Sequence, residues 1–109
     1  MSYEQDKYIT TPDKIKETIA KYGVAIVQNV LDPPEVENMR TGMWSYLEHI
    51  TQNFDKPINR NDSGSWVEYL KLYPIHSMLL QQYQVGHSQF VWDIKQNEKV
   101  VEVFSKLWN

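Results

Sequence analysis

The sequence predicts a helix-dominated α+β fold in a single partial domain that spans residues 1–109. Several stretches place apolar residues at helical spacing behind a helix-capping residue, while one continuous run of β-branched residues is typical of a buried strand. No second run of that kind follows. A length of 109 residues bounds the chain to one domain at most, and 41% hydrophobic with 23% charged residues is typical of a globular protein.

The first elements follow from local capping signals. Residues 1–10 are polar and predict an extended arm. A helix over 12–22 is expected next, because Thr11 can cap it and Pro12 suits its first position. Gly23 suits the stop, since glycine adopts a positive φ at little cost.

The run Val24–Val30 predicts a strand, and Asp32 followed by two prolines predicts the start of a long helix over 33–52. Segment 11–52 therefore reads as helix, strand and helix. A single buried strand leaves its backbone polar groups without partners. We expect the arm of residues 1–10 to pair with it.

The second half of the chain predicts a loop and then short helices. Residues 53–65 are polar and predict a loop of about a dozen residues, which is long enough to indicate a role or mobility. Residues 66–109 predict short helices, namely one or two turns over 66–72, a helix over 75–83, an amphipathic turn over 89–94 and a last helix capped by Asn97.

Composition excludes several classes of function. The net charge is −3 and there is no basic block, which argues against binding of nucleic acid. There are no cysteines, so disulfides and thiolate metal sites are excluded. No apolar run reaches the length of a membrane span, and the N-terminus has no apolar signal core. We therefore expect an intracellular, soluble protein with no membrane partner.

No catalytic residue can be assigned from motifs. The sequence lacks a nucleophile elbow, a phosphate-binding P-loop and a dinucleotide glycine fingerprint. His49, His76 and His87 lack the short paired spacings of metal ligands, so no metal ligand is assigned. A small metalloprotein that uses these three histidines remains a third hypothesis, behind the two given below.

The segment Gly86–Asn97 is the most distinctive candidate for a binding site. Gln89, Trp92 and Lys95 could offer polar or stacking contacts as the wall of a substrate pocket. The alternative is a helix–loop joint in which Trp92 is a buried anchor. Large aromatic residues are also natural anchors of protein interfaces, and the candidates are Trp44, Trp66, Trp92 and Trp108.

Two stretches carry a family resemblance. Lys21–Asp32 (KYGVAIVQNVLD), between two helices, resembles the start of phytanoyl-CoA-dioxygenase-like proteins, which are Fe(II)/2-oxoglutarate oxygenases. His87–Asp93 (HSQFVWD) with Asn97–Phe104 (NEKVVEVF) is similar to a segment that precedes the metal site in one branch of that family. That branch includes uncharacterised microbial and large-virus proteins. The resemblance covers nearly the whole chain from about residue 12.

The resemblance implies the N-terminal helical layer and first strand of a double-stranded β-helix, or jelly roll. In that family a His-x-Asp motif and a distant His bind iron, and an Arg binds 2-oxoglutarate, all beyond the matched region. This sequence has no His-x-Asp or His-x-Glu, so no ligand transfers to it and Fe(II) and 2-oxoglutarate are implied only for a full-length member.

Two functions remain open. The first is the N-terminal, non-metal-binding portion of such an oxygenase, inactive alone and completed by a C-terminal remainder or another chain. The apolar helix face that ends at Trp108, directly before Asn109, favours it. The second is a non-catalytic interaction or structural protein that docks through apolar helix faces, for example in a large assembly such as a virus particle. The expected location is the cytoplasm or a virus particle.

Overall fold

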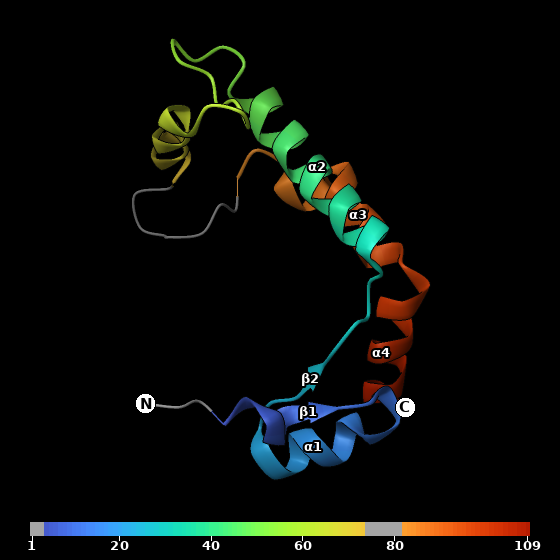
Figure 1. Ribbon diagram of the computed structural model, residues 1–109. Helices are drawn as coiled ribbons and strands as arrows, with labels where there is room; N and C mark the ends of the chain where they lie inside the picture. The colour runs from blue at the N-terminus through green and yellow to red at the C-terminus, as the bar shows by residue number, and fades with distance from the viewer. Residues whose placement is uncertain (1–3, 74–81) are drawn as a thin grey trace. The chain divides into compact units, whose positions relative to one another are not determined.

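The computed structural model describes residues 4–73 and 82–109 (Figure 1). Helices dominate it and the described residues contain one two-stranded parallel sheet, which confirms the helix-dominated α+β class. The chain divides into two compact units, which are described one at a time. Unit 1 comprises residues 1–33 and 95–109, and unit 2 comprises residues 34–94.

Unit 1 is built around the small sheet. Its elements are the 3₁₀ turn η1 (Gln5–Tyr8), strand β1 (Ile9–Thr10), the 3₁₀ turn η2 (Pro12–Lys14), helix α1 (Ile15–Tyr22), strand β2 (Ile26–Val27) and helix α4 (Glu98–Trp108). β1 and β2 run in parallel, with Ile9 opposite Ile26 and Thr10 opposite Val27. The predicted pairing of the arm with the strand is confirmed, although part of the arm coils into η1 and is not extended.

The predicted strand over 24–30 is wrong in length, because only Ile26 and Val27 form the ladder. The partner strand limits it, since Pro12 opens η2 directly after Thr11 and ends β1. On the far side Asn29 adopts a left-handed conformation with a φ of 56°, which breaks the extended backbone.

The ends of α1 differ in how well they match the prediction. Gly23 ends the helix with a φ of 76°, and its N–H donates to the Ile19 carbonyl at 2.7 Å, as expected. Thr11 precedes the first turn, but its side chain makes no capping hydrogen bond, so that prediction is wrong. The Thr11 carbonyl instead accepts a hydrogen bond from the Lys14 N–H at 3.0 Å.

Helix α4 begins where the sequence predicted. The side chain of Asn97 accepts hydrogen bonds from the amides of Lys99 at 3.0 Å and Val100 at 3.4 Å, which satisfies two donors of the first turn. The helix packs against α1 and η2, and Ile15 at the start of α1 is buried. The cap and this packing together fix α4 in unit 1.

The described part of unit 2 is helical apart from its loops. Its elements are helix α2 (Pro33–Ile50, from its second residue), the 3₁₀ helix η3 (Ser63–Leu72), the 3₁₀ turn η4 (Val85–His87) and most of helix α3 (Gln89–Gln96). The helix predicted over 33–52 is confirmed with an end two residues earlier. α3 continues two residues past the amphipathic turn predicted over 89–94, and η3 begins three residues before the predicted 66–72.

Helices α2 and α3 lie side by side because α2 carries a glycine at the contact (Figure 1). A Cβ added to Gly42 would lie 2.6 Å from the Cβ of Phe90, closer than such atoms approach. Only a residue without a side chain allows this approach. Of the helix predicted over 75–83, residues 75–81 lie outside the described residues, and Tyr83 is left-handed with a φ of 58°, so the prediction fails there.

Residues 53–62 are held against α2 by one buried hydroxyl and one half-buried ion pair. The side chain of Thr51 is fully buried, and its Oγ1 accepts a hydrogen bond from the N–H of buried Ile58 at 3.0 Å while it donates to the Leu47 carbonyl at 2.8 Å. Arg60 binds Glu48 through Nε at 3.0 Å, Nη2 at 2.6 Å and its backbone N–H at 3.0 Å. The region predicted as a plain loop is therefore locally ordered.

The loop closes on η3 through a second buried hydroxyl. Ser65 Oγ accepts from the Asn59 N–H at 2.9 Å and donates to the Asp62 carbonyl at 2.6 Å. Asp62 caps η3, because its side chain accepts from the Gly64 N–H at 3.0 Å. The predicted loop over 53–65 thus ends at a capped helix that begins at residue 63.

Candidate functional site

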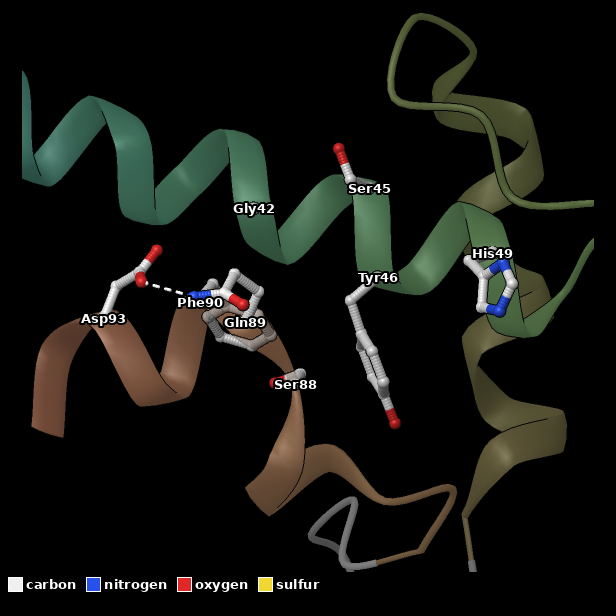
Figure 2. A pocket seen from close by; sticks show the side chains of 8 residues that line it. All are labelled: Gly42, Ser45, Tyr46, His49, Ser88, Gln89, Phe90 and Asp93. Carbon is white, nitrogen blue, oxygen red and sulfur yellow. Dashed lines mark hydrogen bonds between the residues drawn. The ribbon is translucent and has the colours of Figure 1, made fainter.

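A pocket of about 300 Å³ lies between α2 and the start of α3 (Figure 2). Its lining combines a phenyl ring with hydroxyl, imidazole, amide and carboxylate groups, from Gly42, Ser45, Tyr46, His49, Ser88, Gln89, Phe90 and Asp93. In Figure 2 Tyr46 reaches from α2 toward the chain that precedes α3, whereas Ser45 points away from α3. The pocket can hold a small molecule or a side chain of mixed polarity.

Tyr46 lines one side of this pocket and binds the chain segment that precedes α3. Its hydroxyl donates to the Tyr83 carbonyl at 2.8 Å, and its ring centroid lies 5.9 Å from that of Phe90. Burial raises the pKa of the Tyr46 hydroxyl, and the nearby phenols of Tyr69 and Tyr83 raise it further. Tyr46 therefore acts at neutral pH as a protonated hydrogen-bond donor.

The three residues predicted to wall a substrate pocket fall in different places. Gln89 lines the α2–α3 pocket, where its amide donates to the Asp93 carboxylate at 2.7 Å. Trp92 does not line it and is 41% exposed, with its ring 6.3 Å from that of His87, so its alternative reading as a buried anchor is wrong. Lys95 lies in the last turn of α3 and belongs to unit 1.

A second, aromatic pocket of about 210 Å³ brings together two of the predicted interface anchors. Trp44 from α2 and Trp66 from η3 pack with ring centroids 5.2 Å apart, and the Trp66 Nε1–H donates to the Asn59 carbonyl at 3.1 Å. The lining residues are Trp44, Leu47, Ile58, Trp66 and Tyr69. Of the other two candidates, Trp92 is described above, and Trp108 belongs to unit 1 and is exposed.

A third hollow is an apolar groove of about 460 Å³ in unit 1. Every residue that lines it is hydrophobic, and they come from α1, β2 with its flanking chain, and α4: Ile15, Ile19, Ala25, Val27, Val30, Leu31, Val100, Val103, Phe104 and Leu107. Ala25 and Val27 alternate along the strand and so present one face to the groove. The sequence predicted both apolar segments, the β-branched run and the last helix. It did not show that they border one hollow.

The other face of the sheet is apolar as well. Ile9 and Ile26 are paired in register and therefore share a face, and both side chains are exposed. Val24, two residues before Ile26, is exposed too. A parallel sheet in a folded domain is normally covered on both faces.

Ionisable groups in the described part of the chain do not form a metal-binding cluster. No three His, Asp or Glu side chains among residues 4–73 and 82–109 are grouped so that they could hold a metal ion. His49 lines the α2–α3 pocket and His87 lies in η4, while His76 lies outside the described residues.

Hydropathy and comparison add two findings. Across the described ranges, no helix combines the length and the apolar character that crossing a membrane requires. No protein-family model, curated protein or solved structure matches the chain.

Proposed function

We propose that the chain is the N-terminal helical layer of an Fe(II)/2-oxoglutarate oxygenase of the phytanoyl-CoA-dioxygenase-like kind, and that further strands of a jelly roll complete it. The observation that carries the proposal is the sheet of unit 1, in which β2 carries apolar side chains on both faces and each strand is only two residues long. The resemblance of residues 21–32 and 87–104 to that family supports a jelly roll as the core that this layer covers.

The sheet argues for additional strands because its present size cannot stabilise it. Two-stranded sheets are at best marginal in water, and three or more strands or a packed layer are needed. In the described residues the sheet contains β1 and β2 alone, and no strand pairs with the other edge of β2. A strand added at that edge would satisfy backbone groups of β2 and would extend the face formed by Ile9 and Ile26.

The groove argues for an apolar layer from the same core. Its wall on α4 is made by Val100, Val103 and Leu107, which repeat at helical spacing and face α1 and β2. Helices that flank a sheet stabilise a domain by burying such a stripe against it. Longer strands, in greater number, would bring more apolar side chains against this wall than β1 and β2 do.

The catalytic chemistry would belong to the completing strands. A ferrous oxygenase needs a facial triad of two imidazoles and a carboxylate, with open positions for oxygen and cosubstrate. The donors in this chain do not fit that requirement, because none of its three histidines is followed by the x-Asp or x-Glu of the motif. The chain would contribute packing and shape, and no iron ligand.

The gene tests this proposal directly. We expect the reading frame that follows residue 109, or a frame elsewhere in the same genome, to encode a His-x-Asp or His-x-Glu motif, a later histidine and an arginine on alternating apolar strands. A genome with no such frame would overturn the proposal.

A binding experiment tests the groove. Where the His-x-Asp motif lies on a separate polypeptide, Val103→Asp should abolish copurification of that polypeptide with this chain, because it places a charge in the apolar wall. Met43→Asp is the matched control at an exposed position of α2 and should leave copurification intact. Circular dichroism of both variants checks that the helices remain. Equal copurification of the two folded variants would contradict the proposed use of the groove.

A second function, a non-catalytic interaction protein, is favoured by the surface of η3. Trp66, Val67 and Leu70 are all exposed there, and Trp66 borders the aromatic pocket. Exposed aromatic and aliphatic residues around a pocket are typical of interface anchors. If the chain is monomeric in sedimentation at high concentration and no partner copurifies through Trp66, this alternative is excluded.

A further inference from the structure

The pocket between α2 and α3 lies beside the close contact of the two helices. Gly42 allows that contact, since a Cβ added to it would lie 2.6 Å from the Phe90 Cβ. Tyr46 and His49 follow Gly42 at i+4 and i+7 along α2, and Asp93 follows Phe90 at i+3 along α3. Each helix therefore provides one wall of the pocket, and every residue that lines it belongs to unit 2.

The hydroxyl donors in this lining are already engaged by the chain. The Tyr46 hydroxyl donates to the Tyr83 carbonyl at 2.8 Å, and the Ser88 hydroxyl donates to the Val85 carbonyl at 2.6 Å. A hydroxyl has one hydrogen and two lone pairs. Both oxygens therefore meet a ligand as hydrogen-bond acceptors.

The amide and the carboxylate of the lining also leave acceptors. Gln89 donates from Nε2 to Asp93 Oδ1 at 2.7 Å, which engages one of its amide hydrogens and leaves its Oε1 as an acceptor. A carboxylate accepts at two oxygens, and residues 4–73 and 82–109 engage Asp93 only at Oδ1. The lining thus offers a ligand one full negative charge and several lone pairs.

Two aromatic rings provide the apolar part of the pocket. The ring centroids of Tyr46 and Phe90 are 5.9 Å apart, and their planes are tilted by 52°. Both side chains are half-buried, whereas Asp93 is exposed at the rim. The faces of such rings attract cations as well as apolar groups. A ligand would therefore place its apolar body on the rings and its charged end near the carboxylate.

We infer that this pocket binds a small organic ammonium ion with an aromatic body. An ammonium group carries three donors and no acceptor, which complements the lone pairs that the lining leaves. The Asp93 carboxylate offsets the partial positive charge at the start of α3, so that helix end does not select an anion. Figure 2 shows His49 at the opposite end of the pocket from Asp93, so the imidazole does not cover the carboxylate.

The inference does not rest on the proposed function, because it uses neither the sheet nor the groove of unit 1. Binding can be measured on the whole 109-residue chain without iron, cosubstrate or a second polypeptide. A negative result would therefore leave the proposed function untouched.

Three matched probes of the same body test the charge of the ligand. Phenethylamine is the cation, phenethyl alcohol is neutral and hydrocinnamate is the anion. Amide shifts of the ¹⁵N-labelled chain measure affinity and locate the contact. We expect the amine to bind with a dissociation constant on the order of 1 mM and to shift the amides around Tyr46 and Phe90. The alcohol should bind more weakly, and the anion should bind most weakly.

A fourth probe distinguishes a free small molecule from a protein side chain. Nα-acetyl-lysine amide carries the same cation on an aliphatic stem. It should bind more weakly than phenethylamine, because it brings no ring to the two rings of the pocket. Equal or tighter binding of the lysine probe would overturn the assignment to a small aromatic cation.

Two variants separate the charge from the rings. Asp93→Asn keeps the shape and the acceptor for Gln89, and it should weaken the amine about two- to fivefold. Asp55→Asn changes the net charge equally at an exposed position outside the lining and should bind normally. Phe90→Leu should weaken the amine more than the alcohol, since only the cation gains charge attraction from the ring face.

Several results would overturn the inference. These are equal affinity for the three probes of different charge, tighter binding of the anion, and amide shifts that map outside the pocket lining. An Asp93→Asn variant that binds the amine as well as Asp55→Asn, with both folded by circular dichroism, would overturn it too.

Discussion

Replacing Thr51 by valine should loosen the segment that follows α2. The hydroxyl of Thr51 is the acceptor for the Ile58 N–H, and the two residues are 0% and 3% exposed. Valine has the same shape and the same β-branching, so it fills the site without a new clash. The Leu47 carbonyl keeps a partner, since it also accepts from the Thr51 backbone N–H at 3.2 Å. The substitution therefore orphans one buried donor, the amide of Ile58.

The cost follows from that single loss. A buried donor without a partner costs about 1–3 kcal/mol. Because about 1.4 kcal/mol corresponds to a factor of ten, protection of the Ile58 amide from hydrogen exchange should fall by about fivefold to a hundredfold. The free energy of unfolding of unit 2, measured by urea titration, should fall by the same amount, about 1–3 kcal/mol.

Thr41→Val is the matched control, because Thr41 lies on the same helix and is exposed. Exposed substitutions of this kind usually change stability by less than about 0.5 kcal/mol. If Thr51→Val and Thr41→Val gave the same exchange rate at Ile58 and the same free energy of unfolding, the hydroxyl would not hold the segment and the reasoning would be refuted.

Three further changes have defined outcomes. Hydrogen bonds from the Arg60 side chain, and then from its backbone N–H, hold the pKa of Glu48 below its usual value. The stability that this pair contributes is therefore present above about pH 4.3 and is lost as the pH falls through the lowered pKa. Glu48→Gln should reduce the fall in the free energy of unfolding at acid pH, and an unchanged fall would contradict this. Gly42→Ala should destabilise unit 2 by about 1–3 kcal/mol through its clash with Phe90, in spite of the better helix propensity of alanine. Gly86→Ala is the control, because a Cβ at Gly86 would meet open space. A Gly42→Ala variant that is more stable than the original chain would show that α2 and α3 do not approach as described. Asn97→Ala should cost about 0.5–2 kcal/mol and speed exchange of the Lys99 and Val100 amides, and unchanged exchange would disprove the cap.

Local signals predicted the helix boundaries well where a side chain or glycine acts on its own neighbours. Asn97 caps α4 and Gly23 ends α1 as expected, because both effects depend only on residues within one turn. Thr11 failed because a backbone bond from Lys14 satisfies the first turn instead. The strand over 24–30 failed because its length depends on a partner that is distant in sequence, and β1 provides only two residues.

The site was less predictable because it depends on contacts across the chain. Nothing in the local pattern showed that Thr51 and Ser65 would be buried and would order the loop between them. Gln89 was singled out and does line a pocket, but the α2 residues that line it with Gln89, such as Tyr46, lie forty or more residues away in the sequence. The pairing of Trp44 with Trp66 needed the path of the loop, which periodicity does not give.

The central proposal is that this chain supplies a packing layer and that the sequence carrying the His-x-Asp motif supplies the iron centre. The most direct measurement is turnover of 2-oxoglutarate with Fe(II), made on the purified 109-residue chain and on the same chain joined to the polypeptide that carries the His-x-Asp motif. We expect turnover by the joined protein and none by the chain alone. Turnover by the 109 residues alone, or its absence in a folded joined protein, would contradict the claim.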